Sequence, residues 1–203
     1  MARWSRWYIA PQTSAAPPAT LDDPLWQRIS VSPIGPTATA LTFAAKLARE
    51  NGWTASHAAR AIAEYRRFCY LGLMAGHEVT PSDAVDQCWH LHLTYTRDYW
   101  ERFCPQVLGR PFHHGPTAGG PAELGRHFAQ YAATLRSYEA AFGLPPRDVW
   151  PAAQETLLTA PRARRVNLSE VLIIPHRTIR LALLALLALS GLAIAVWALM
   201  RFP

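Results

Sequence analysis

AVDQCWHLHLTYTRDYWERF, residues 84–103, is the stretch of sequence that decides the fold. Placed on a helix at about 100° per residue, its apolar and aromatic side chains gather on one broad stripe. The stripe consists of Val85, Trp89, His92, Thr96, Tyr99 and Phe103. Such a stripe is typical of a helix that packs against a core. We therefore expect one continuous helix from Thr80, its cap, through Pro81 in the first helical position to about Cys104.

Four other segments of the chain have helical spacing, and none has the sustained alternation that a half-buried strand needs. One expected helix starts near Asp22, and the other three run over residues 37–51, 56–75 and 121–142. In the segment 37–51 the expected stripe is Leu41, Ala44, Ala45 and Ala48, and Gly52 ends the helix. Trp150, in a proline-rich closing segment, is expected to pack back onto the bundle. The predicted fold class is all-α, a bundle of about five helices followed by one C-terminal transmembrane helix.

The transmembrane prediction comes from LALLALLALSGLAIAVWALM, residues 181–200, which contains no charged side chain. At about 1.5 Å per residue, a helix of this length crosses a hydrocarbon core of roughly 30 Å. We divide the chain into a flexible segment (1–21), a helical globular domain (22–157), a basic juxtamembrane linker (158–178) and the transmembrane helix (179–201). This is the arrangement of a tail-anchored, single-pass membrane protein.

The charge distribution predicts orientation and partners. The formal charge is +6, from 20 Lys and Arg against 14 Asp and Glu. Five arginines precede the apolar run and one follows it: Arg162, Arg164, Arg165, Arg177 and Arg180, then Arg201. The positive-inside rule then places the domain in the cytoplasm, and an arginine-rich, lysine-poor composition fits a bacterial inner membrane. The expected partners are membrane lipid and a possible protein in the membrane, because juxtamembrane arginines attract anionic headgroups; nucleic acid is not expected.

A candidate metal site lies on the polar edge of the 84–103 helix. Asp86 and His90, at i and i+4, share a face, whereas His90 and His92 point in different directions. Imidazole and carboxylate suit a divalent metal, zinc above all. His113 or His114 would complete the set if the following Pro/Gly-rich loop folds back along the helix. An ordinary exposed pair, or a buried histidine satisfied by an aspartate, explains the same spacing.

Two alternatives concern the cysteines and His92. Cys88 and His92 form a second i,i+4 pair that Cys69 could extend into a metal site, although ordinary core packing explains Cys88 as well. An odd number of cysteines without a CxxC pair argues against a disulfide scaffold and for a reducing compartment. We expect His92 to be a hydrogen-bonded core residue and keep it as a candidate ligand-binding residue.

A candidate anion-binding segment follows, HHGPTAGGPAE, residues 113–123, with glycines before a helix start. It lacks the GK[ST] ending of a nucleotide-binding loop. Arg110, His113, His114 and Arg126 supply positive charge, and a plain turn with a helix cap explains the same glycines. The candidate ligand-binding residues of the whole region are His92, Thr96, Arg97, Arg110 and His113.

VDQCWHLHLTYTRDYW followed by FHHGPTAGGPAE resembles a family, the glycine-rich domain-containing proteins of plants and related bacterial membrane proteins. In the family pattern, PSDxVDxxWHxHLxxTxxY is followed by HHxPTxGG, and with WQRI, EYRRF and FGLPPRDVWP the resemblance covers about residues 22–151. It implies a shared helical domain and no defined activity. This chain departs from the family in having a membrane anchor and no glycine-rich tail.

Two classes of function fit these features. The first is a membrane-tethered module that binds a ligand or partner through a histidine- and aromatic-lined surface. The second is a metal-dependent hydrolase in which Asp86, His90 and His114 hold the ion and Asp83 or Glu123 acts as base. The sequence offers ligands but no convincing base, so we favour the binding module.

Overall fold

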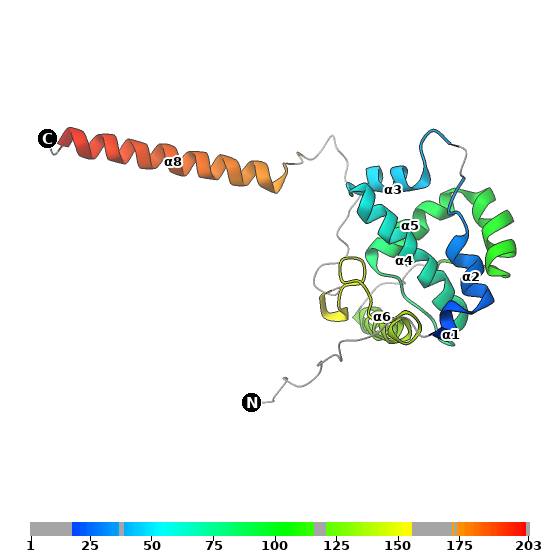
Figure 1. Ribbon diagram of the computed structural model, residues 1–203. Helices are drawn as coiled ribbons and strands as arrows, with labels where there is room; N and C mark the ends of the chain where they lie inside the picture. Colours follow the sequence, from blue (N-terminus) through cyan, green and yellow to red (C-terminus); the bar gives the residue numbers. More distant parts are fainter. Residues whose placement is uncertain (1–17, 37–38, 116–120, 156–171, 173, 202–203) are drawn as a thin grey trace, which may run out of the picture. The chain divides into compact units, whose positions relative to one another are not determined.

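The computed structural model of the chain describes residues 18–36, 39–115, 121–155, 172 and 174–201. These residues form helices and no strands, which confirms the all-α prediction. They divide into two units, residues 1–163 and 164–203, each described by itself. In the first unit α4 (Ala55–Met74) is central, with α2, α3, α5 and α6 packed against it (Figure 1).

The domain begins with α1 (Pro18–Leu21) and α2 (Pro24–Val31). Asp23 caps α2, since its Oδ1 accepts a hydrogen bond of 2.7 Å from the backbone N–H of Leu25, and Pro24 follows it in the first turn. The expected start of a helix near Asp22 is therefore confirmed. Because α1 is helical, however, residues 18–21 do not belong to the flexible segment to which we assigned them.

The next helix, α3 (Phe43–Asn51), starts later than expected. Thr42 is its N-cap, accepting from the backbone N–H of Ala45 at 3.2 Å, so the predicted start at Thr37 is wrong. Gly52 ends the helix with a φ of 65°, as expected.

The buried face of α3 also differs from the prediction. Phe43 and Leu47 are buried, whereas Leu41 lies before the helix and is 38% exposed. The predicted stripe was centred too close to Leu41 and Ala45, which are exposed, although Ala44 and Ala48 do pack against the core.

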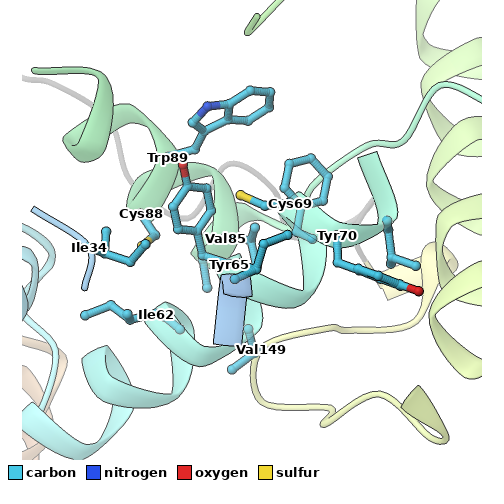
Figure 2. Packing of buried hydrophobic residues seen from close by; sticks show 14 of the residues in the cluster. Ile34, Ile62, Tyr65, Cys69, Tyr70, Val85, Cys88, Trp89 and Val149 are labelled. Atoms are coloured by element: carbon cyan, nitrogen blue, oxygen red, sulfur yellow. The ribbon is translucent and has the colours of Figure 1, made fainter. Parts of the chain in front are cut away.

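The central helix α4 runs one residue ahead of the predicted range 56–75, capped by Thr54. Its buried side chains include Ile62, Tyr65, Phe68 and Cys69. Figure 2 shows side chains of α4 gathered with Val85, Cys88 and Trp89 in one cluster. Most of the core of the first unit is built around this helix.

The predicted continuous helix over residues 84–103 is wrong. Ser82, and not Thr80, caps α5 (Asp83–Thr94), and the chain breaks at Tyr95 before a π-helix, η1 (Asp98–Leu108). Val85, Trp89, His92, Tyr99 and Phe103 are buried as the stripe predicted. Thr96 is exposed, because it lies in the connection between the two helices.

Contacts across this break explain why the chain turns. The indole Nε1 of Trp89 donates to the hydroxyl of Tyr99 at 2.8 Å, although ten residues would separate them by about 15 Å along a straight helix. Nε2 of His92 lies 2.8 Å from Oδ2 of Asp98. The turn at Tyr95 therefore brings η1 back against α5 and satisfies buried polar groups of both.

Helix α6 (Pro121–Phe142) also belongs to this unit, and its bounds match the prediction. The closing segment returns to the core, because Trp150 is fully buried and its Nε1 donates to Oε2 of Glu64 at 3.0 Å. This confirms the prediction that Trp150 packs back onto the bundle.

The second unit contains α8 (His176–Arg201). Residues 176–197 are long and apolar enough to cross a membrane, and their leucines are exposed, for example Leu183 at 56% and Leu187 at 66%. The helix starts inside the range that we assigned to the linker. Arg162, Arg164 and Arg165 lie outside the described residues.

Candidate metal centre

Helix α5 presents Asp86 and His90 on one face, one turn apart, as the i,i+4 spacing predicted. The His90 Nε2 atom lies 3.7 Å from the Asp86 Oδ2 atom. The Ser82 cap starts α5 at Asp83, so both residues lie inside the helix, where positions i and i+4 share a face. Two of the three expected ligands are thus positioned by local helical geometry.

The third ligand, His114, comes from the chain after η1. Its Nε2 lies 2.9 Å from Oδ1 of Asp86 and 3.1 Å from Nε2 of His90. One ligand atom from each of the three residues can be chosen so that all lie within 4.8 Å of one another. We call Asp86, His90 and His114 the His–Asp cluster.

The distances within the His–Asp cluster suit a small divalent ion. With metal–ligand bonds of about 2.0–2.1 Å, ligand atoms lie about 3.3 Å apart at tetrahedral angles and about 2.9 Å apart at right angles. The observed separations are 2.9 Å from Nε2 of His114 to Oδ1 of Asp86, 3.1 Å between the two imidazole Nε2 atoms, and 3.7 Å from Nε2 of His90 to Oδ2 of Asp86. They are close to these values, with the two imidazoles facing different oxygens of the carboxylate. An ion would enter with small side-chain movements.

The cluster opens to solvent on one side. The side chain of His90 is 49% exposed, and those of Asp86 and His114 are 26% and 21% exposed. Three protein ligands on a partly exposed edge leave a coordination position for water or another ligand, as in catalytic rather than structural zinc sites. Since an ionised carboxylate can only accept, Nε2 of His114 donates this hydrogen bond in the absence of an ion, and an ion would bind the tautomer that carries its proton on Nδ1.

The other candidate ligand-binding residues lie apart from the cluster's contacts. The ring of His113 packs on Trp100 at 5.2 Å between centroids, and Nη2 of Arg110 donates to the carbonyl of Leu73 at 3.1 Å. Thr96 and Arg97 are exposed between α5 and η1. Of the two candidate histidines, His114 therefore lies against the carboxylate of Asp86, whereas His113 packs on Trp100.

The structure describes the side chain of one of the two candidate bases. Asp83 lines a hollow of about 240 Å³ with Trp53, His57 and Asp148. The side chain of Glu123 lies outside the described residues, as do the glycines at 119–120 of the proposed anion-binding segment. The hydrolase alternative therefore gains three converging ligands from the described residues.

His92 is a core residue with both ring nitrogens engaged. It is fully buried, its Nδ1 lies 3.1 Å from the Tyr65 hydroxyl, and its Nε2 lies 2.8 Å from Asp98. Asp98 in turn accepts from Arg102 at 2.5 Å and from the backbone N–H of Gly35 at 3.0 Å. A ligand therefore cannot contact His92 directly in this packing. The side chain of His92 is buried between α5 and the elements that pack against it.

The alternative metal site of Cys69, Cys88 and His92 is excluded by the same burial. His92 has no nitrogen left for a metal, and Cys69 and Cys88 are fully buried. Burial raises the pKa of the Cys88 thiol well above its usual value and raises that of Cys69 beyond its usual range. Both cysteines remain protonated and act as core side chains.

Burial gives His92 a testable effect on acid stability. It lowers the pKa of His92 from 6.5 to about 4, although Asp98 opposes the shift. As the pH falls from 6.5 to 4, the unfolded chain therefore binds more protons than the folded chain, and stability is lost. We expect urea denaturation to show a loss of up to about 3 kcal/mol over this range. In His92→Gln, less stable at pH 7, this pH dependence should be much smaller; an equal dependence would contradict the assignment.

Comparison with known proteins adds one similarity. Residues 40–136 are similar to the family described as UCP032817-like. The matched segment runs from just before α3 into α6, so it includes the whole His–Asp cluster. No curated protein and no solved structure matches the chain. The resemblance to glycine-rich domain proteins stays a prediction.

Proposed function

We propose that this chain is a single-pass membrane protein whose helical domain binds one divalent transition-metal ion, zinc in the first place, through Asp86, His90 and His114. The observation that carries the proposal is the convergence of two imidazoles and one carboxylate, from segments 24 residues apart, at separations of 2.9–3.7 Å. Two neutral imidazoles and a carboxylate form a donor set that zinc and its neighbours prefer.

The metal would give the domain a ligand-binding position. An ion of charge +2 held by one carboxylate keeps a net positive charge, and the exposed side of His90 leaves it accessible. Water or an anionic group of a ligand or partner protein would complete the coordination. An accessible, positively charged coordination position of this kind is what a binding module requires.

The membrane part of the proposal rests on α8. Arg177 and Arg180 lie in its first turns, and arginines near an anionic leaflet gain about 1 kcal/mol each. The proposed orientation keeps the helical domain on the arginine-rich, cytoplasmic side. The metal site would then work at a membrane surface in a reducing compartment, where the three buried thiols persist.

Metal binding is tested on the full chain purified in detergent without chelators. We expect near one equivalent of zinc by elemental analysis and by calorimetric titration. His90→Ala and His114→Ala should each abolish its retention. Zinc at 100 times its Kd should stabilise the folded chain by about 2.7 kcal/mol, and a chelator should reverse this.

The controls match the ligands in type. His113→Ala removes the neighbouring histidine, which packs on Trp100, and His57→Ala removes a histidine that also lies near a carboxylate, 3.8 Å from Asp148. Both should bind zinc as the unaltered chain does. A chain that holds no stoichiometric metal, and whose melting ignores zinc, manganese and iron, would contradict the proposal.

A further inference from the structure

His114 reaches the cluster only because the chain after η1 turns back along α5. Gly109 ends η1 with a φ of 79°, a left-handed conformation that favours glycine, and five residues later His114 lies against Asp86. Within this short return, Phe112 is the residue that makes the deepest contacts with the helices. How Phe112 is held therefore decides where His114 lies.

The ring of Phe112 fits between α4 and α5. It stacks on the indole of Trp89 with centroids 4.6 Å apart and planes 12° apart, and it contacts Phe68 at 5.9 Å. On α4 it lies over Gly72, where an added Cβ would come within 2.5 Å of the Phe112 ring. The ring of Phe112 can occupy this position because Gly72 has no side chain.

The backbone of Phe112 is held by Tyr99. This tyrosine is fully buried on η1, and its hydroxyl donates to the carbonyl of Phe112 while accepting from Nε1 of Trp89 at 2.8 Å. Burial raises the pKa of Tyr99 far above its usual value, so the hydroxyl remains a donor. One hydroxyl thus joins α5, η1 and the returning chain.

The same indole touches the metal cluster. Trp89 precedes His90 on α5, and its ring packs edge-on against the ring of His114, with centroids 4.6 Å apart. Only His113 separates the held Phe112 carbonyl from His114. The position of His114 is therefore fixed by the contact of its ring with Trp89 and by its short covalent connection, through His113, to Phe112.

We infer that Trp89, Tyr99 and Phe112 form a latch that preorganises the metal centre, and that the hydroxyl of Tyr99 is its positioning group. The inference rests on the proposed metal binding and goes beyond it, since none of the three residues touches the ion. Groups that orient metal ligands without binding the metal typically change its affinity 10- to 100-fold. A preformed cluster binds tightly because the returning chain need not be ordered by the ion.

The experiment is zinc titration of full-length Tyr99→Phe in detergent. This variant keeps the ring and removes only the hydroxyl. We expect one equivalent of zinc at saturation, with a Kd about 10- to 100-fold higher than that of the unaltered chain. Tyr131→Phe is the matched control, because it removes another buried hydroxyl that donates to a backbone carbonyl, that of Pro151 at 3.0 Å. Its Kd should be unchanged.

A second variant disturbs the latch from α4. Gly72→Ala places a methyl group against Phe112 and should weaken zinc binding in the same direction. An unchanged Kd in Tyr99→Phe, beside a normal zinc site in the unaltered chain, would overturn the latch and leave the proposed metal binding intact.

A metal-free measurement keeps the two proposals distinct. In the chain labelled at histidine, NMR should show proximity between the rings of His114 and Trp89 without zinc, and Tyr99→Phe should lose it while Tyr131→Phe retains it. If the unaltered chain binds no metal, the proposed function fails. The latch is then supported by loss of this contact in Tyr99→Phe and overturned by its retention.

Discussion

Glu64→Leu should lower the free energy of unfolding of the helical domain by about 3–5 kcal/mol, the cost typical of breaking a buried charge network. Glu64 is only 3% exposed and lies on α4. Its Oε2 accepts from the Tyr138 hydroxyl at 2.7 Å and from Trp150 Nε1 at 3.0 Å, and its Oε1 accepts from Arg67. Leucine fills the space but leaves these donors without their acceptor.

The physical reason for so large an effect is that the donors remain buried. Tyr138 and Trp150 are 1% and 0% exposed, so water cannot replace the carboxylate without opening the core. Arg67 also donates to the Tyr138 hydroxyl at 3.0 Å, which ties the charge of the arginine to the same network. An unsatisfied buried donor costs about 1–3 kcal/mol, and two buried donors, those of Tyr138 and Trp150, lose their partner together, whereas the side chain of Arg67 is 35% exposed.

Urea denaturation followed by circular dichroism measures the effect. Glu64→Gln keeps one carbonyl oxygen and should fall between the unaltered chain and Glu64→Leu. Glu50→Leu is the control, because Glu50 is an exposed surface partner of Lys46 at 3.9 Å and should change stability by no more than about 0.5 kcal/mol. Equal urea midpoints for Glu64→Leu and Glu50→Leu would show that the network does not stabilise the fold.

This network also shows what a sequence alone does not reveal. The closing role of Trp150 could be predicted from a lone tryptophan in a proline-rich segment. Its partner could not, because Glu64 lies 86 residues earlier and looks like an ordinary polar helix residue. A glutamate becomes a core residue only where donors from distant segments meet it.

The break at Tyr95 was missed for a related reason. No glycine or proline occurs in residues 84–103, so local chemistry gave no signal of a turn. The turn is stabilised by tertiary contacts, Trp89 with Tyr99 and His92 with Asp98. Helical periodicity nevertheless predicted most buried residues on both sides of the break.

The geometry of the candidate site was predictable in part. Asp86 and His90 follow from the i,i+4 rule, and the Pro/Gly-rich loop suggested that a histidine returns to them. Which histidine returns depends on the latch, because Phe112 fixes the register and directs His114 toward Trp89. The roles of Phe112 and Gly72 depend on packing that spacing does not encode.

Substitutions in α8 are expected to have the largest effect on whether the chain stays in the membrane. Its apolar part, residues 176–197, is about 33 Å long at 1.5 Å per residue, close to the roughly 30 Å hydrocarbon core of a bilayer. Near its end the guanidinium of Arg201 lies over the ring of Trp197 at 5.2 Å. Tryptophan and arginine are typical of the membrane–water interface, so this pair marks the far boundary of the span.

Charges in the middle of this helix should therefore abolish membrane retention. Leu186→Arg combined with Leu189→Arg adds about 2.5–3.5 kcal/mol of insertion cost for each arginine. We expect the unaltered chain to pellet with membranes and resist carbonate extraction, and the double variant to become extractable. Removing the chain from Ile179 onward should have the same effect and leave a soluble helical protein.

The control is Leu186→Ala with Leu189→Ala, which shortens the same two side chains but keeps the helix apolar and should remain membrane-bound. Reporters fused at Met1 and after Pro203 give the orientation, expected to be cytoplasmic and exterior, because Arg177 and Arg180 precede the uncharged run of residues 181–200 and Arg201 follows it. Moving arginines from the first flank to the second should weaken or invert this orientation. Recovery of the unaltered full chain in the soluble fraction without detergent would contradict the anchor, since exposed leucines along α8 would then need another cover.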